Sequence, residues 1–282
     1  MDAEDARLRE WIGRTETARE VIHSERARAL QATLDREPLL RDGDALPPLW
    51  HWLYFWTTVP RSGLGRDGHP ALGGFLPPVG AARRMWAGSR VRWPGRLLLG
   101  EEARRTSSIL DVVLKTGRTG RLVFVTVRHE ISGSAGLAIV DEHDIVYRED
   151  TGAGVQTRGG EPAPAGATFS RPMQADTTML FRYSALTFNG HRIHYDRDYA
   201  MRVEGYSGLV VHGPLLATLM ADLAACSRPD RPMAEFAFRG HRPVIDTDPF
   251  TVCGTASGDA DLDLWVADHE GVLAMKGRAV FR

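Results

Sequence analysis

The chain has 282 residues, of which 43% are hydrophobic and 25% charged, and its formal net charge at pH 7 is −1. This composition is typical of a globular protein, and the near-zero charge argues against a basic surface for nucleic acid. No stretch reaches the roughly 18 apolar residues of a membrane span, and the charged N-terminus lacks the apolar core of a signal peptide. We therefore expect a cytoplasmic protein that binds neither nucleic acid nor membrane. Two cysteines, Cys226 and Cys253, are too few for a disulfide framework and are expected to be buried apolar residues.

The N-terminal region is predicted to be helical. Within residues 1–37, Leu8, Trp11 and Ile12 share one helical face, and Ser24 is placed to cap a second helix. The aromatic run 46–56 fits either a buried helical turn or a strand. Residues 57–80 are rich in Gly and Pro, which predicts a long loop of the kind that lines a binding site.

Strands are predicted from about residue 90 onward. Branched and aromatic residues at 122–127 and 137–147 flank a turn at 132–136, which indicates an antiparallel pair. After a strand-like start near residue 178, the run Leu215–Ala225 is apolar on nearly every side and predicts a buried helix. Four further strands are expected at about 233–240, 250–257, 261–268 and 271–281.

The two halves of the chain end alike. Ile145-Val-Tyr-Arg148 closes the first half and Ala279-Val-Phe-Arg282 closes the second. This weak repeat favours an internal duplication, with a chance similarity of hairpins as the alternative. The expected fold class is α+β, with two halves that each wrap an antiparallel sheet around one apolar helix. We place the halves at residues 1–150 and 171–282, joined by a linker of Gly, Ala and Pro at 151–170.

The segment 181–196 concentrates side chains that can do chemistry. It contains Asn189, His191 and His194, and His212-Gly213 follows directly before the predicted buried helix. Histidine is the side chain whose ordinary pKa lies nearest to working pH, so it is the first candidate for proton transfer.

This pattern resembles a known family. Thr187-Phe-Asn-Gly-His-Arg-Ile-His194 and His212-Gly-Pro-Leu-Leu216 are similar to the motifs of the MaoC-type (R)-specific enoyl-CoA hydratases and 3-hydroxyacyl dehydratases. In those motifs an Asp and a His five residues apart precede a His-Gly pair at the central helix. The runs 49–55, 74–78 and 84–88 resemble the longer branch of the family, which includes hydratases of mesaconyl-C4-CoA and itaconyl-CoA. The resemblance implies a double hot-dog fold, in which the first half is non-catalytic and completes the pocket.

One position departs from the family motif. Asn189 stands where the family has Asp, and an amide cannot take a proton. The resemblance therefore implies that His194 alone acts as the base, while Asn189 holds the water with its amide oxygen. The helix start at Gly213 would supply N–H groups that stabilise the charge on the thioester oxygen. No cofactor is implied beyond the coenzyme A that is part of the substrate.

Further candidates for substrate binding surround these residues. His191 either contacts substrate or braces the loop, Tyr195 braces His194, and His212 orients the start of the helix. A zinc site made of His191, His194 and His212 lacks a Cys or Glu to complete it, so no metal is predicted.

Coenzyme A also needs cationic partners for its phosphates. Arg83, Arg84, Arg239 and Arg242 are the candidates, although scattered arginines usually form a solvated surface. Arg84 is preferred because Trp86 beside it can flank an acyl or adenine group.

We therefore expect a hydro-lyase that hydrates an enoyl-CoA or dehydrates a 3-hydroxyacyl-CoA. The expected substrate is small and branched or dicarboxylic, such as mesaconyl-C4-CoA or itaconyl-CoA. Two alternatives stay open: a 3-hydroxyacyl dehydratase that acts on acyl carrier protein, and a non-catalytic subunit that binds acyl-CoA. By analogy with other hot-dog sheets, which often pair, a homodimer is expected.

Overall fold

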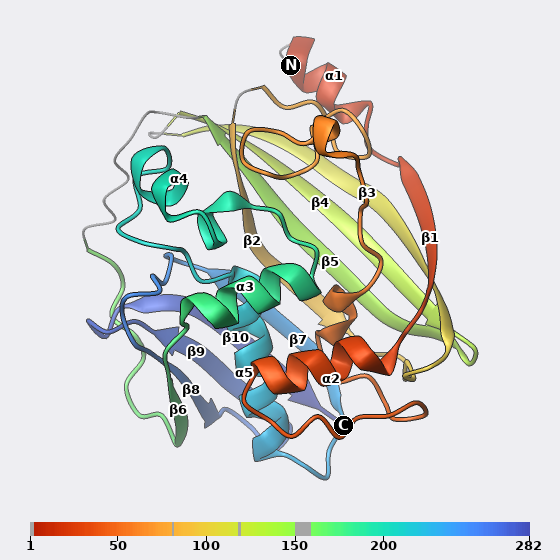
Figure 1. Ribbon diagram of the computed structural model, residues 1–282, viewed down its shortest axis with the longest axis vertical. Helices are drawn as coiled ribbons and strands as arrows, with labels where there is room; N and C mark the ends of the chain where they lie inside the picture. The colour runs from red at the N-terminus through yellow and green to blue at the C-terminus, as the bar shows by residue number, and fades with distance from the viewer. Residues whose placement is uncertain (1–2, 81, 118–119, 150–158) are drawn as a thin grey trace.

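The computed structural model describes residues 3–80, 82–117, 120–149 and 159–282, and its described strands form one ten-stranded antiparallel sheet (Figure 1). The first five strands are β1 (Thr15–Val21), β2 (Ala82–Arg92), β3 (Glu102–Gly117), β4 (Gly120–Gly133) and β5 (Gly136–Glu149). The other five are β6 (Phe169–Met173), β7 (Met233–Gly240), β8 (Phe250–Ala256), β9 (Asp261–Ala267) and β10 (Leu273–Phe281).

The strand order shows that the sheet has two equivalent halves. It runs β1-β3-β4-β5-β2-β7-β10-β9-β8-β6, so the order of the second half mirrors that of the first. Strands β5 and β10 carry the two similar segments that close the halves, 145–148 and 279–282. They occupy equivalent positions in the strand order. The expected double hot-dog fold of class α+β is therefore confirmed. The predicted boundary at residue 150 and most of the linker, residues 151–158, lie outside the described residues.

One of the described helices precedes β1, and the others lie between the first two strands of each half, β1 and β2 or β6 and β7. They are α1 (Ala3–Arg9), α2 (Ser24–Thr33), α3 (Thr177–Leu186), α4 (Arg197–Arg202) and α5 (Gly213–Ser227), with 3-10 turns η1 (Trp50–Leu53), η2 (Arg61–Gly63) and η3 (Arg192–His194). In Figure 1, α2, α3 and α4 are gathered in front of the sheet, and the loop of residues 57–80 (orange) lies beside them over the N-terminal strands. Among the described residues, no helix has the length and apolarity needed to cross a bilayer.

Helix α5 is the core of the C-terminal half. Nine of its residues are buried, and it packs against β7, β8, β9 and β10. Because almost every side of a buried helix meets protein, its sequence is apolar all round, as expected from Leu215–Ala225. Burying each of its Leu and Met side chains stabilises the fold by roughly 1.5–3 kcal/mol relative to leaving it exposed to water.

The N-terminal region differs from the continuous helical region predicted for residues 1–37. Strand β1 interrupts it and pairs with β3 at the sheet edge. Helix α2 begins at Ser24, but its N-cap is His23, which makes no side-chain cap bond, so the predicted capping role of Ser24 is wrong. Residues 177–186 form helix α3, capped by Asp176, where a strand was expected. The expected burial of both cysteines is also half wrong, since Cys253 is buried and Cys226 is exposed.

The two halves are joined edge to edge by β2 and β7. Ser89 pairs with Phe238 and Val91 with Phe236 in this seam. At Gly88, where β2 has a bulge, a Cβ would collide with the carbonyl oxygen of Phe238. A glycine is therefore required there for the two strands to approach.

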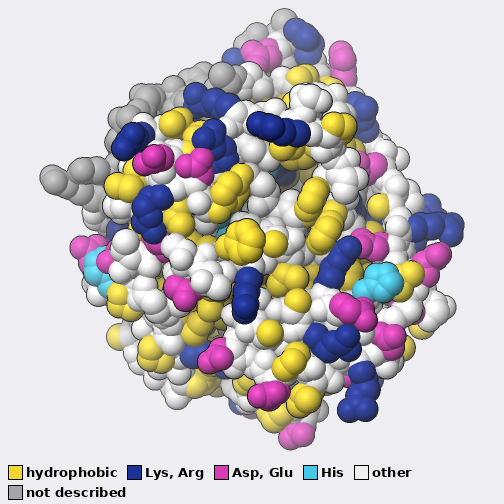
Figure 2. Space-filling view, in the orientation of Figure 1, with side chains coloured by type: hydrophobic (Ala, Val, Ile, Leu, Met, Phe, Trp, Pro, Cys, Tyr) yellow, Lys and Arg dark blue, Asp and Glu magenta, His cyan; other side chains and the backbone are white. Residues whose placement is uncertain are grey.

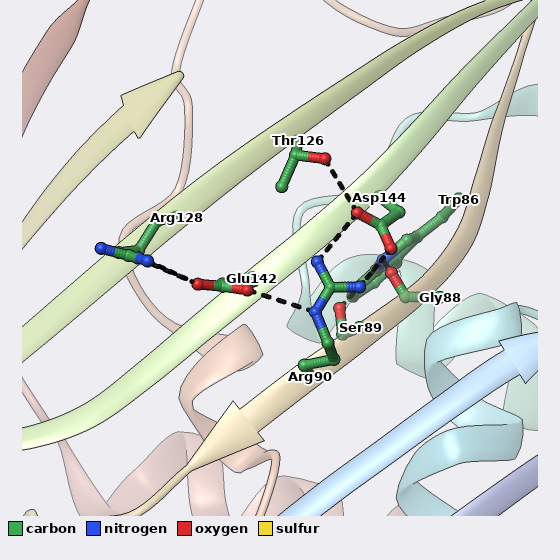
Figure 3. Close-up of polar contacts among 8 residues, drawn as sticks. All are labelled: Trp86, Gly88, Ser89, Arg90, Thr126, Arg128, Glu142 and Asp144. Atoms are coloured by element: carbon green, nitrogen blue, oxygen red, sulfur yellow. Dashed lines mark hydrogen bonds and ion pairs between the residues drawn. The ribbon is translucent and has the colours of Figure 1, made fainter. Parts of the chain in front are cut away.

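The exposed face of the N-terminal sheet carries a ladder of ion pairs (Figure 3). Arg90 on β2 pairs with Glu142 at 3.2 Å and Asp144 at 2.6 Å, both on β5. Arg128 on β4 pairs with Glu142 at 2.8 Å, and the Thr126 hydroxyl donates to Asp144. Such exposed pairs contribute at most about 1 kcal/mol each, so they register the strands more than they stabilise the fold.

The buried face of the same strands holds a second polar network. The Asp141 carboxylate is fully buried and accepts hydrogen bonds from the rings of His51, Trp52 and His143 at 2.7–2.9 Å. Burial favours the neutral acid, but the two histidines outweigh it and hold the pKa of Asp141 well below its ordinary value. This network ties η1 to β5.

Candidate functional site

His194 is the last residue of η3 and is 6% exposed. Its Nδ1 lies 2.7 Å from the carbonyl oxygen of Val210, and because a carbonyl can only accept, Nδ1 carries the proton. The neutral ring then offers the lone pair of Nε2. Burial lowers the pKa of His194 to about 4, although the bond to Val210 opposes this. At neutral pH, His194 therefore has the charge state and tautomer of a general base.

The ring of His212 holds that of His194 in place. The two ring centroids are 3.7 Å apart and the planes differ by 19°. His212 Nε2 lies 2.8 Å from the hydroxyl oxygen of Ser184, while its Nδ1 is buried without a partner among the described residues. Burial, followed by the nearby His194, lowers the pKa of His212 well below its ordinary value. The stacked pair is therefore neutral.

Asn189 shapes the loop that precedes His194. Its Oδ1 accepts a hydrogen bond from the backbone N–H of His191 at 3.0 Å, which closes a local turn. The amide oxygen thus has one lone pair in use and one left for a water. The ring of His191 lies next to that of His194, with the two centroids 5.3 Å apart.

The long loop of the N-terminal half closes over this segment. The backbone N–H of Arg192 donates to the Asp67 carbonyl at 2.9 Å. Gly68 has φ +89°, and a Cβ there would collide with the Gly190 carbonyl oxygen, while a Cβ on Gly190 would lie 2.7 Å from the Gly68 oxygen. Two facing glycines therefore let the two backbones touch.

This contact brings Asp67 and His69 into the site, which the sequence prediction missed. His69 lies 4.3 Å from His191 between ring centroids, and its Nδ1 is 3.0 Å from the Asp67 carboxylate. The available signal was a histidine between glycine and proline in a loop predicted to line a binding site. No spacing rule linked it to His194, which is more than a hundred residues away.

Gly213 opens helix α5 directly after His212. The first N–H groups of a helix have no partner within it, and Pro214 has no N–H, which leaves Gly213 as the first donor. A Cβ at Gly213 would meet only the Met275 methyl at 3.9 Å. The backbone at this helix start is therefore not crowded by other side chains.

The other predicted binding residues are divided. Arg84 lies close enough to His69 and His191 to influence both electrostatically. Trp86 packs on Trp52 and donates its indole N–H to the Gly88 carbonyl, as Figure 3 shows.

Tyr195, Arg239 and Arg242 lie toward the surface. Tyr195 is 47% exposed and donates its hydroxyl to the Gly190 carbonyl, so it braces the loop. Arg239 is an exposed residue of the β7 seam. Arg242 is paired with Asp268 at 3.1 Å, so its charge is already compensated.

Exposed aromatic rings lie beside the loop that carries Asn189 and His194. Phe188 has φ +51° and is 52% exposed, and its ring stacks on Trp56 at 4.9 Å and 10°. The guanidinium of Arg26 also lies over the Trp56 ring, 3.9 Å from its centroid. Figure 2 shows hydrophobic side chains exposed near the centre of this face, with basic side chains among them.

One group of possible metal ligands occurs among the described residues. Ligand atoms of Asp67, His69 and His191 lie within 4.8 Å of one another. The carboxylate of Asp67 already accepts from His69, which satisfies both groups without an ion. The set differs from the His191, His194 and His212 combination considered from the sequence.

Comparison with known proteins assigns the family. Residues 49–246 match the hydroxyacyl-thioester dehydratase type 2 family. The chain is 44% identical over 266 residues to a mesaconyl-C(4)-CoA hydratase of Chloroflexus aurantiacus, an alignment that covers 94% of each chain. The chain belongs to the hydroxyacyl-thioester dehydratase type 2 family. It is also 28% identical over 250 residues to a mitochondrial family member of Schizosaccharomyces pombe, covering 79% of this chain and 82% of the other.

Solved structures show the same fold for this dehydratase family member. A MaoC-like dehydratase of Phytophthora capsici superposes with a TM-score of 0.71 at 13% identity, covering 100% of this chain and 99% of the other. A Mycobacterium tuberculosis protein described as a double hotdog superposes with a TM-score of 0.58, covering 96% of each chain. The expected relationship to MaoC-like double hot-dog proteins is therefore confirmed.

Proposed function

We infer that this protein catalyses the reversible hydration of an enoyl-CoA thioester, with a small substrate such as mesaconyl-C4-CoA. The observation that carries the inference is the state of His194. It is buried and neutral, with Nδ1 bonded to Val210, and no described residue forms a hydrogen bond with Nε2; its ring stacks on His212, the N-cap of α5. A family of hydroxyacyl-thioester dehydratases and a 44% identical mesaconyl-C(4)-CoA hydratase support the reaction class.

The reaction follows from this geometry. Nε2 of His194 takes a proton from water while the water oxygen bonds to the β-carbon of the enoyl thioester. The C=C electron pair moves toward the thioester, whose oxygen gains charge near the N–H of Gly213 and the positive end of α5. His194 then returns the same proton to the α-carbon, so no atom is lost. Asn189 holds the water through the second lone pair of Oδ1.

The N-terminal half supports a short acyl group. Leu72, Phe75, Leu76 and Val79 from the 57–80 loop pack onto the cluster that contains Ile145 and Tyr147 on the sheet. We propose that these apolar side chains limit the length of the acyl group that the protein accepts.

The test is turnover by the purified protein. Crotonyl-CoA, mesaconyl-C4-CoA, itaconyl-CoA and a crotonyl acyl carrier protein are each incubated with it, and hydrated products are measured by mass spectrometry. His194→Ala should lose at least about 10²-fold in kcat, the usual contribution of a general base. His241→Ala, which changes an exposed histidine of the same half, should keep the wild-type rate. Thioester binding without turnover of any substrate would instead favour the non-catalytic subunit.

We further propose that the reaction needs no cofactor and that the enzyme is a cytoplasmic homodimer. Sedimentation velocity on the purified chain tests the dimer, and cell fractionation tests the location.

A further inference from the structure

Arg84 and Tyr147 form an unexplained polar pair on the sheet of the N-terminal half. They are direct register partners on β2 and β5, so their side chains stand next to each other on one face. Tyr147 is 1% exposed, and its hydroxyl has no hydrogen-bond partner among the residues that the structure describes. Arg84 is partly buried and makes no hydrogen bond or ion pair with any residue that the structure describes.

The duplication shows that the Tyr147 hydroxyl is not needed for packing. Ile145-Val-Tyr-Arg148 at the end of β5 corresponds to Ala279-Val-Phe-Arg282 at the end of β10. Phe281 fills the equivalent place in the core with no hydroxyl and is 4% exposed. A buried hydroxyl without a partner costs about 1–3 kcal/mol, so its presence at Tyr147 points to a ligand.

The pair lies near His69 and His191, which adjoin the proposed base His194. The charge of Arg84 acts on His69 and His191, and both Arg84 and Asp67 act on Tyr147. His69 lies 4.3 Å from His191, whose ring is 5.3 Å from that of His194. The carboxylate of Asp67 is bonded to His69, and no ion pair joins it to Arg84.

We propose that Arg84 and the Tyr147 hydroxyl bind the free carboxylate of a dicarboxylic acyl group. The assignment rests on the proposed hydration of enoyl-CoA thioesters and names the residues that select the acyl part. A guanidinium and a hydroxyl both donate, and together they match the two oxygens of a carboxylate. An acyl carboxylate satisfies the orphan hydroxyl and compensates the arginine in one step.

The position favours an acyl carboxylate over a coenzyme A phosphate. In mesaconyl-C4-CoA the free carboxylate is attached to the β-carbon, which is the carbon that water attacks. A subsite for it therefore belongs beside the histidines that adjoin the base, and the charge of Arg84 acts on two of them, His69 and His191. The phosphates lie at the far end of the pantetheine arm, away from the reacting carbons.

The experiment compares a carboxylate with a methyl group at the same carbon. Mesaconyl-C4-CoA is the substrate, and 3-methylcrotonyl-CoA, which has a methyl in place of the carboxylate, is the competitive inhibitor. Tyr147→Phe should lower kcat/KM for mesaconyl-C4-CoA about 10-fold, and Arg84→Gln about 30-fold or more, because a hydrogen bond to a charged group is worth more than a neutral one. The inhibition constant of 3-methylcrotonyl-CoA should stay within about 2-fold.

Arg104→Gln, an exposed arginine on β3 of the same sheet, is the matched control and should change neither constant. If the inhibition constant rises as much as kcat/KM falls, Arg84 binds coenzyme A or supports the fold, and the subsite is wrong. Unchanged kcat/KM in both variants also overturns it. Wild-type turnover of crotonyl-CoA but not of mesaconyl-C4-CoA rejects the subsite and leaves hydration standing. No turnover of any thioester rejects the proposed function itself.

Discussion

The imidazole rings of His194 and His212 stack with their centroids 3.7 Å apart, and both are neutral. A general base works only in its deprotonated form, and burial lowers the pKa of His194 to about 4. We therefore expect kcat/KM to change less than about 2-fold between pH 8 and pH 6. The acid limb should begin only below about pH 5. Initial rates in overlapping buffers test this, and an acid limb near pH 6.5 would show that the base titrates as an ordinary histidine.

The same burial makes the fold sensitive to acid. The pKa is lowered in the folded state at His69, His129, His191, His194 and His212, chiefly by burial. In the unfolded chain these groups titrate near 6.5, so below that pH the unfolded state binds more protons. Their contribution to stability is fully present above pH 6.5 and is lost as the pH falls toward 4. Each extra proton lowers the free energy of unfolding by about 1.4 kcal/mol per pH unit.

Urea denaturation at pH 7.5, 6.5 and 5.5 measures this acid sensitivity. His194→Gln should reduce the slope of stability against pH, whereas His241→Gln, at an exposed position, should not. Equal stability at pH 7.5 and 5.5 would contradict the assignment of neutral buried histidines.

Substitutions of Asn189 separate its structural role from its chemical one. Asp keeps an acceptor for the His191 N–H, so Asn189→Asp should fold like wild type, whereas Asn189→Ala loses the turn bond. The added carboxylate should also raise the pKa of His194, because a nearby negative charge favours the protonated ring. The acid limb of the pH profile should therefore move to higher pH in Asn189→Asp. Higher activity in Asn189→Ala than in Asn189→Asp would argue against any role for an acceptor at this position.

Gly213→Ala tests whether substrate lies at the start of α5. The added methyl meets only Met275 at 3.9 Å, and Ala is a good helix former. The free energy of unfolding should therefore change by less than about 0.5 kcal/mol. The methyl points into the open space beside the helix start, and kcat/KM should fall about 10-fold or more. Gly240→Ala, where the nearest atom is 3.8 Å away, is the matched control. An unchanged kcat/KM in Gly213→Ala would place the thioester elsewhere.

Chelation tests the expectation that no metal takes part. Asp67, His69 and His191 have the spacing of metal ligands, but the proposed steps pass only through His194, Asn189 and Gly213. Dialysis against EDTA should leave kcat unchanged, and metal analysis should find less than about 0.1 equivalent of zinc per chain. Loss of activity that returns with added zinc would assign this group to catalysis.

Local sequence patterns predicted the parts of the site that lie close together in the chain. Asn189, His191 and His194 fall within six residues, and His212-Gly213 precedes a helix that is apolar all round. Periodicity likewise placed α5 and the last four strands close to their observed bounds.

The remaining features depend on tertiary contacts. Strand β1 is a mostly polar edge strand, Thr15–Val21, in which alternation carries no apolar face to detect. Asp67 reaches the site through a loop, and Tyr147 reads as an ordinary strand residue until its hydroxyl is seen to lack a partner.

The two halves that meet at β2 and β7 are parts of one chain, so their sequences need not be identical. In a symmetric dimer, every change of residue appears twice, once on each side of the axis. Here the two equivalent positions belong to one chain, so Tyr147 and Phe281 were able to diverge. On the proposed mechanism, the C-terminal half keeps the buried proton-transfer residues, while the N-terminal half can change the residues that contact the acyl group. Substrate preference can therefore evolve in one half without disturbing the chemistry in the other.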